Sequence, residues 1–356
     1  MVRKVGTTRI LREIGRGGMG VVYEGKQDDL DRPVAVKALD QKLARSKEVT
    51  ERFRREGRAY ARLQHEAIPA VHDLVEKDDG LYLVTELVDG ADLARVLAKG
   101  GALPADCVAV VGARVADALD YVHFNALLHR DVKPANVMAS REGDVKLMDF
   151  GIAKGEEDPS LTRAGMLIGS PSYMAPEVLA GWEAGPPADV WALGVTLYEL
   201  LTGEKPFRGR DAEDLFAAIQ RGKIRRVRAL APDCPRRLAR TVERCLSRTP
   251  ADRFKSAGVL ARELDGIAAR LLKRRFAASI HPRARLVALL ANRGFVTEQI
   301  ALGKLDASTL AATRIADARG TATMAEFPTA RRRRASLAVA LALAAAVGLF
   351  VFFARH

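Results

Sequence analysis

Cysteine is scarce in this chain, which has only Cys107, Cys234 and Cys245. They form no CxxC pair and no other metal-ligand spacing, which excludes a thiolate metal site of the usual kinds. Three cysteines also cannot all pair within one chain. We therefore expect reduced thiols buried in the core.

The first 18 residues lack an apolar run, because charged side chains occur in every turn. This argues against a secretory signal and predicts that the large domain stays in the cytoplasm. Internal repeats and long low-complexity stretches are also missing. With 356 residues and 48% hydrophobic content, the chain is long enough for one large globular domain and an additional segment.

Acidic residues are few only near the C-terminal end. Residues 267–334 hold 14 Lys/Arg against 4 Asp/Glu, a net charge of +10, whereas the first 266 residues hold 42 against 40, a net of +2. Most of the overall charge of +13 therefore belongs to the tail. The large domain lacks the general basic bias of a nucleic-acid-binding protein, so we expect no nucleic-acid partner.

Two patterns follow each other along the chain. Residues 8–89 alternate short apolar, β-branched runs with Gly-rich or acidic turns, which predicts an antiparallel sheet. One segment, Ser46 to Leu63, has helical spacing instead and predicts a single helix. From Leu93 to about Ala269 longer helical stretches dominate. The predicted fold class is α+β, with a small β-rich lobe before a larger helical lobe.

A glycine-rich segment, IGRGGMGVVYEG, lies between two predicted strands and places Gly15, Gly17 and Gly20 in a G-x-G-x-x-G pattern. Such glycines let the backbone approach phosphate groups closely, although glycine-rich hairpins without a ligand are also common.

A lysine follows this segment on a later strand. VAVKAL places Lys37 between apolar residues with its ammonium aimed at the glycine loop. Glu56, in the predicted helix, is the expected carboxylate partner of Lys37, and Glu51 is the competing candidate.

Polar residues gather in a second constellation, HRDVKPANVM, with DFG 13 residues after Asn136. Asp131 suits the base that orients a substrate hydroxyl and accepts its proton, and Lys133 would balance charge at a γ-phosphate. Asn136 and Asp149 offer oxygen ligands, which suit Mg²⁺, with Mn²⁺ as an alternative ion. An acidic and basic turn without catalytic use is the competing interpretation, and the order and spacing of the two segments argue against it.

A third segment, GSPSYMAPE, spans Gly169 to Glu177. With these motifs present once each and in order, residues 8–266 resemble the eukaryotic-type Ser/Thr protein kinases of bacteria. The resemblance implies a two-lobed kinase fold, with ATP as cofactor and Ser/Thr hydroxyls of proteins as acceptors. Ser170 stands where this family usually has Thr, and it keeps a hydroxyl that is able to contact Asp131 and Lys133.

The resemblance also implies an adenine pocket and several supporting residues. Thr85 resembles the gatekeeper, while Glu86 and Val88 would supply backbone groups of the hinge. Three apolar side chains would enclose the purine: Val22, Ala35 and Met138. Three further residues have scaffold roles, with Glu177 expected to pair with Arg253, and Asp189 to brace the catalytic loop.

Regulation is expected on the loop between Asp149 and Glu177. Arg130, beside Asp131, is a cation that in such kinases binds a phosphate on this loop. The hydroxyls available are Ser160, Thr162, Ser170 and Ser172. We hypothesise that Thr162 is autophosphorylated; the alternative is that it is an ordinary loop residue.

Residues 335–354 are 20 consecutive uncharged residues, about 30 Å long as a helix at roughly 1.5 Å per residue. This predicts a single membrane-spanning helix, and a buried Ala-rich helix is the alternative. Arg331 to Arg334 precede it, so the positive-inside rule places the kinase domain at the cytoplasmic face. Only residues 355–356 follow the apolar run, so we expect no external sensor domain.

The predicted domain organisation follows from these segments. An N-terminal extension covers residues 1–7, and the kinase domain covers 8–266, with lobes at 8–89 and 90–266. Residues 267–334 form a basic juxtamembrane linker, which either lies on anionic lipid or is a solvated spacer. Relatives often form dimers through their small lobes, but no residue here identifies a homodimer. The competing functions are an inactive kinase-fold scaffold and a small-molecule phosphotransferase.

Overall fold

The computed structural model describes residues 4–17, 20–77, 80–150, 171–275 and 281–297. All of them belong to the first of two compact units, residues 1–317. The second unit, residues 318–356, lies outside the described part, and so does the predicted membrane helix at 335–354.

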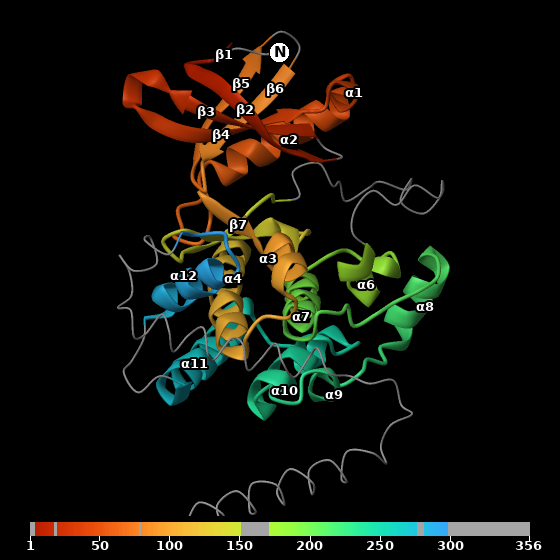
Figure 1. The fold of residues 1–356 in the computed structure, drawn as a ribbon. Coiled ribbons are helices and arrows are strands. Elements are labelled where there is room, and N and C mark those ends of the chain that lie inside the picture. Colours follow the sequence, from red (N-terminus) through yellow and green to blue (C-terminus); the bar gives the residue numbers. More distant parts are fainter. Residues whose placement is uncertain (1–3, 18–19, 78–79, 151–170, 276–280, 298–356) are drawn as a thin grey trace, which may run out of the picture. The chain divides into compact units, whose positions relative to one another are not determined.

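The N-terminal part is an antiparallel sheet of six strands in the order β1-β2-β3-β4-β6-β5 (Figure 1). Its strands are β1 (Lys4–Val5), β2 (Thr8–Gly17), β3 (Gly20–Gln27), β4 (Arg32–Leu39), β5 (Val71–Lys77) and β6 (Gly80–Glu86). Two helices interrupt the sheet between β4 and β5, the short α1 (Gln41–Ala44) and α2 (Lys47–Tyr60). The predicted antiparallel sheet and its single long helix are confirmed.

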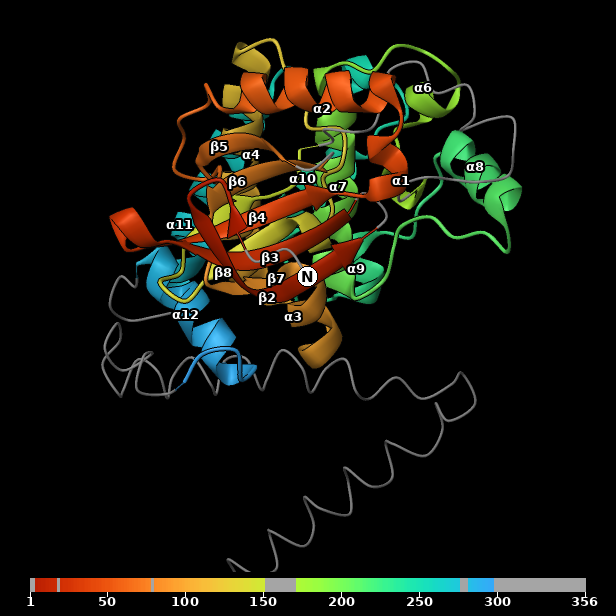
Figure 2. The same ribbon diagram turned by 90° about the horizontal axis from the view of Figure 1, so that it is seen from above.

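Helix α2 begins where the sequence predicts, because the Ser46 side chain accepts a hydrogen bond from the Val49 amide and caps the helix. Its buried side chains, Phe53 and Tyr60, join the apolar cluster that contains Leu83 of β6. A Cβ atom at Gly57 would lie 3.5 Å from Leu74, an ordinary van der Waals distance, so α2 packs directly against the sheet at this position (Figure 2).

The second part begins at β7 (Gly90–Asp92), which forms a small sheet with β8 (Val137–Ser140) and β9 (Val145–Leu147). The remainder is helical: α3 (Leu93–Gly100), α4 (Ala105–Phe124), α6 (Pro176–Leu179), α7 (Pro186–Thr202), α8 (Ala212–Arg221), α9 (Val227–Leu230), α10 (Arg236–Cys245), α11 (Ala257–Arg275) and α12 (Pro282–Asn292). Helices α4 and α7 are the centre of this lobe, because most of their residues are buried. The predicted larger helical lobe is confirmed.

The thiols of Cys107, Cys234 and Cys245 are all buried, as expected from the sequence. Burial raises the pKa of both Cys234 and Cys245 to about 12.

The C-terminal end of this lobe differs from the prediction. The boundary expected at residue 266 falls inside α11, which continues to Arg275. Beyond it, α12 contacts α4 and β8, and Leu286 to Leu290 are buried. Part of the segment predicted to be a solvated or lipid-bound linker is therefore packed protein.

Candidate active site

The pairing of three strands brings the predicted nucleotide residues to one face of the first sheet. Lys37 on β4 lies opposite Val22 on β3, and Ala35 lies opposite Thr85 on β6. The intervening residues, including Val34 and Val36, belong to a separate apolar cluster. Because side chains alternate between the faces of a sheet, the four predicted residues share the opposite face.

The glycines of the β2–β3 hairpin differ in what surrounds them. A Cβ atom at Gly20 would lie 1.9 Å from the Ala38 carbonyl oxygen, so this position requires glycine for the fold. A Cβ atom at Gly17 would meet nothing within 4 Å among the described residues. Gly15, opposite Val22, is similarly open. Space at Gly15 and Gly17 is therefore available for a ligand.

Lys37 binds a carboxylate other than the one expected. Its Nζ lies 2.6 Å from Asp149 Oδ1, and within the described ranges no salt bridge joins Lys37 to Glu56. The competing candidate, Glu51, pairs with Arg54 on the same helix at 2.6 Å. Lys37 and Asp149, 112 residues apart in sequence, are thereby brought together at the predicted site.

The catalytic-loop residues are joined by short hydrogen bonds. Asp131 Oδ2 accepts one bond from Lys133 Nζ and one from Asn136 Nδ2, both 2.9 Å long. Asn136 Nδ2 also donates to the Asp131 carbonyl, and the Met148 amide donates to the Asn136 carbonyl at 2.7 Å. These bonds fix the Asp131 carboxylate and bring the strand before Asp149 beside Asn136.

Two residues of the site that are not glycine have a left-handed backbone conformation, with φ of 64° at Arg130 and 51° at Asp149. Such residues are uncommon and cluster at functional sites, where the surrounding structure holds them. At Arg130 the support is visible, since its amide and that of His129 both donate to the Asp189 carboxylate at 2.9 Å. The prediction that Asp189 supports the catalytic loop is confirmed.

Two histidines complete this support, and sequence reasoning missed both. His123 Nε2 donates to Asp189 at 2.8 Å. Buried His129 donates from Nε2 to the Met148 carbonyl, and its Nδ1 accepts from the Asp131 amide. Burial lowers the pKa of His129, so both bonds involve a neutral ring. The H of HRD was the available signal for His129.

Phe150 of the DFG segment lies between rings of both lobes. Its centroid is 4.2 Å from Tyr60 on α2 and 4.7 Å from His129. Aromatic pairs at such distances add about 0.5–1.5 kcal/mol beyond the area that they bury. Neither Tyr60 nor Phe150 was predicted, although these tilted ring contacts connect α2 to the catalytic loop.

The predicted hinge residues lie where β6 ends. Val88 is buried, and the Glu86 carboxylate accepts from the Ala70 amide. Lys146 of β9, which was not predicted, binds both carboxylate oxygens of Glu86 at 2.8 and 2.9 Å. Met138 on β8 lies opposite Lys146 in the second sheet.

The predicted pair between Glu177 and Arg253 is formed. Arg253 donates from both terminal nitrogens to the two Glu177 oxygens at 2.6 and 2.7 Å, and it also donates to the carbonyls of Ser247, Pro187 and Arg248. The guanidinium is fully buried and stacks on Trp191 at 4.9 Å. This pair fixes the segment that follows residue 170 to the core.

Several predictions concern residues outside the described part. Ser160, Thr162 and Ser170 all fall there. In the part that is described, no helix is long and apolar enough to cross a membrane. No group of three or more His, Cys, Asp or Glu side chains in metal-binding range occurs in the same part.

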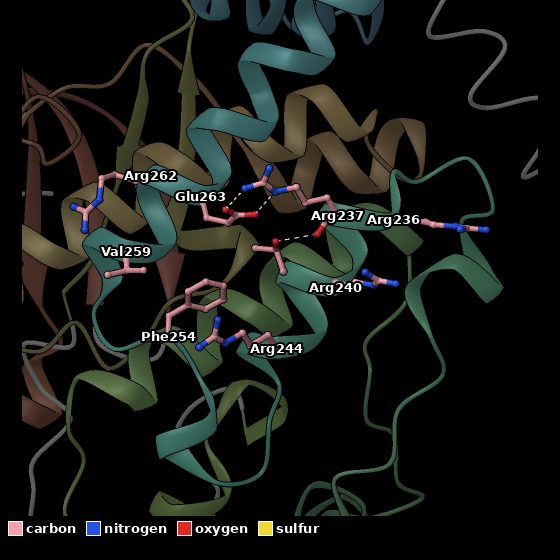
Figure 3. Close-up of a pocket in the computed structure, with 9 residues that line it drawn as sticks. Arg236, Arg237, Arg240, Arg244, Phe254, Val259, Arg262 and Glu263 are labelled. Carbon is pink, nitrogen blue, oxygen red and sulfur yellow. Dashed lines mark hydrogen bonds and ion pairs between the residues drawn. The ribbon is translucent and has the colours of Figure 1, made fainter.

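A cavity of about 750 Å³ lies between α10 and α11 (Figure 3). Arg244 stacks on Phe254 there, and Arg237 forms a bidentate pair with Glu263. Figure 3 shows Arg236 and Arg240 directed away from Phe254. None of the predicted catalytic or nucleotide residues lines this cavity.

The known proteins that are similar to this chain are protein kinases. The model of the protein kinase domain family matches residues 8–264. The serine/threonine-protein kinase PknL of Mycobacterium tuberculosis is 38% identical over 261 residues, which are 73% of this chain and 65% of PknL. PknH of Mycobacterium bovis is 38% identical over 257 residues, 72% of this chain and 43% of PknH. The chain thus matches less than two thirds of these relatives' length.

Solved structures of other proteins are also similar to this chain. A crystal structure of the Mycobacterium tuberculosis PknI kinase domain has a TM-score of 0.61 and 33% identity, covering 74% of this chain and 96% of that domain. A crystal structure of Rad53 residues 1–466 in complex with AMP-PNP has a TM-score of 0.61 and 25% identity, covering 72% of this chain and 64% of that one.

Proposed function

Because this chain belongs to the protein kinase domain family, we propose that it is a serine/threonine protein kinase that uses ATP. The observation that carries the proposal is the fixed Asp131 carboxylate, held at 2.9 Å by both Lys133 and Asn136. Such a carboxylate suits a general base, because proton transfer requires a positioned acceptor.

In the proposed reaction Asp131 orients the acceptor hydroxyl and takes its proton as the hydroxyl oxygen attacks the γ-phosphorus. The bond between the γ-phosphorus and the β–γ bridging oxygen breaks, and ADP leaves with that electron pair. Lys133, beside Asp131, would stabilise negative charge on the transferred phosphoryl group.

Asn136 and Asp149 are the proposed holders of Mg²⁺, with Mn²⁺ as an alternative. Their geometry fits, because the Asn136 amide nitrogen is directed to Asp131, which leaves the amide oxygen for a cation. Two protein ligands are sufficient, since Mg²⁺ usually binds one or two side chains together with substrate phosphates. When bound, the ion would neutralise phosphate charge.

Lys37 is proposed to bind phosphate oxygens of ATP, with Glu56 as its carboxylate partner in the nucleotide complex. This requires Lys37 to leave Asp149, its partner in the present structure. The exchange is chemically reasonable because a cation bound by Asp149 would compete with Lys37 for the same oxygen.

The finer proposals concern regulation and location. We propose that Thr162 is autophosphorylated and that Arg130 binds its phosphate, which a comparison of Thr162→Ala with wild type would test. We also propose that residues 335–354 anchor the enzyme in the membrane, with the kinase domain cytoplasmic. The protein partners are substrates with Ser/Thr acceptors.

The test of the central proposal is an assay with radiolabelled ATP and Mg²⁺ on a generic basic protein substrate. Wild type is expected to label itself and the substrate, and Asp131→Asn to lower kcat by roughly 10²–10⁴-fold. Asp117→Asn is the control, because Asp117 is a half-exposed carboxylate on α4. Absence of label from wild type would favour an inactive scaffold, and label on small molecules alone would favour a small-molecule phosphotransferase.

A further inference from the structure

Residues 281–297, which we call the brace, fold onto the large lobe although they follow the end of the matched kinase domain at residue 264. Helix α12 within the brace contacts α4 and β8. Leu286, Val287, Leu289 and Leu290 are at most 2% exposed. Burial of these large apolar side chains stabilises the docked position of the brace.

A buried ion pair fixes the register of the brace. Arg285 Nε donates to Asp106 Oδ2 of α4 at 2.8 Å, and both side chains are at most 1% exposed. A charge is buried only when it is paired, so the two residues, 179 positions apart, require each other. The docked position of α12 is therefore specific.

The two ends of the brace bind two different elements. At its start, Arg283 Nε lies 2.8 Å from Asp144, and the Arg283 carbonyl lies where a Cβ atom of Gly143 would be. At its end, Arg293 donates to the carbonyls of Val96, Gly101 and Ala102, which close α3. The brace thus connects the turn between β8 and β9 (residues 141–144) with the end of α3.

That turn is in turn bound to the hinge. The Arg141 amide donates to the Asp89 carbonyl at 2.9 Å, and the Arg141 guanidinium pairs with the Asp89 carboxylate at 3.0 Å. Two residues after the turn, Lys146 holds the Glu86 carboxylate. The turn that the brace contacts is therefore bonded to residues 86–89 through Arg141 and Lys146.

We propose that the brace positions the nucleotide hinge: its docking holds the β8–β9 turn, and Lys146 and Arg141 transmit this position to Glu86 and Asp89. Undocking the brace would let residues 86–89 shift and weaken nucleotide binding. Lys146 and Arg283 act here as positioning residues. The inference rests on the proposed function only in assuming that the hinge binds the adenine of ATP.

The test uses the full chain and the fluorescent nucleotide TNP-ATP, whose binding needs no catalysis. Leu286→Asp, which removes an apolar contact of α12, is expected to raise the Kd about fivefold, within the range of coupling through networks. Lys146→Gln is expected to raise the Kd by the same factor while α12 remains docked. In the double variant the Kd should also be only about fivefold higher than in wild type, because both changes break the same path. Values of kcat at saturating ATP should stay within twofold.

Hydrogen exchange over residues 282–292 reports whether the brace has undocked. Arg237→Gln, which breaks an exposed pair with Glu263, is the control and should leave the Kd unchanged. An unchanged Kd in Leu286→Asp with exposed amides at 282–292 would overturn the proposal, as would fully additive effects in the double variant. Binding without phosphoryl transfer would contradict the proposed enzyme activity while leaving the Kd comparison valid.

Discussion

The pair of Arg253 and Glu177 offers a direct measure of what burial contributes at one residue. Arg253→Met leaves Glu177 without its cation in a site that is 9% exposed, and we expect a loss of about 3–5 kcal/mol in the free energy of unfolding. Urea unfolding followed by circular dichroism measures it.

The chain provides a matched control for that prediction. Arg237 and Glu263 also form a bidentate pair, through Nε and one terminal nitrogen at 2.5 and 2.6 Å, but the arginine is 56% exposed. Arg237→Met should cost less than about 1 kcal/mol. Equal losses in the two variants would show that burial is not the cause.

His129 and Asp189 make stability depend on pH in one direction. Burial lowers the pKa of His129. Burial alone would raise the pKa of Asp189, but the hydrogen bond from His123 and the nearby imidazoles outweigh it and lower that pKa. The unfolded chain therefore binds more protons in each case, so stability falls as pH drops below about 6.5 for the histidine and below about 3.8 for the aspartate.

We expect unfolding free energies to fall between pH 7.5 and 5.5 by at most about 1.4 kcal/mol per unit for this histidine. Urea titrations at both pH values test this, with His129→Asn as the comparison. The variant should show a smaller pH slope. Identical slopes would mean that His129 does not contribute.

At this scale, sequence motifs predicted which residues meet but not every contact between them. Asp189 and Arg253 were assigned correctly because their partners belong to motifs of fixed spacing. In the present structure Lys37 binds Asp149 and not Glu56, because both are carboxylates and the choice between them depends on how α2 and the DFG segment pack. Lys146 lacked any motif signal.

Among the elements, the β2–β3 hairpin separates a glycine needed for folding from one available to a ligand. Gly20→Ala places a Cβ atom 1.9 Å from a backbone oxygen and should destabilise the protein, by about 1–3 kcal/mol for a strained backbone position. Gly17→Ala has space in the described structure and should leave the melting temperature nearly unchanged. It should instead weaken ATP binding if phosphates approach this backbone.

Calorimetric melting and TNP-ATP titration of both variants measure the two effects. A stable Gly20→Ala protein would show that the hairpin adapts to the added methyl group. Unchanged nucleotide affinity in Gly17→Ala would exclude close contact between phosphates and residue 17.

Helix α12 shows why one element escaped prediction. Residues 267–334 are basic, and Arg285 and Arg293 were counted among the charges of a linker that was expected to be either solvated or bound to anionic lipid. Arg285 is in fact buried against Asp106, and Arg293 closes α3 through backbone carbonyls. These partners lie between 179 and 197 residues away, so no local pattern reveals them. By contrast, α2 was predicted because the spacing of its own residues defines it.

For the whole molecule, the proposed anchor predicts where the protein is found. The full chain should sediment with membranes and resist extraction by alkaline carbonate. A chain that ends at residue 334 should remain in the supernatant, because 20 uncharged residues are lost with their burial in lipid.

Fractionation by ultracentrifugation with immunoblotting measures this distribution. Replacing Arg331 to Arg334 by glutamine is the control, since it changes charge and keeps the apolar run. The same distribution for the full and shortened chains would contradict the anchor.

The buried thiols make the protein suitable for spectroscopy without engineering of its core. A thiol whose pKa is about 12 is almost never a thiolate at neutral pH, so maleimides should not react with Cys234 and Cys245. Leu30 in the small lobe and Phe124 in the large one are 66% and 88% exposed, so labels at these positions would lie in solvent. Spin labels on cysteines introduced there would report the distance between the lobes as nucleotide binds.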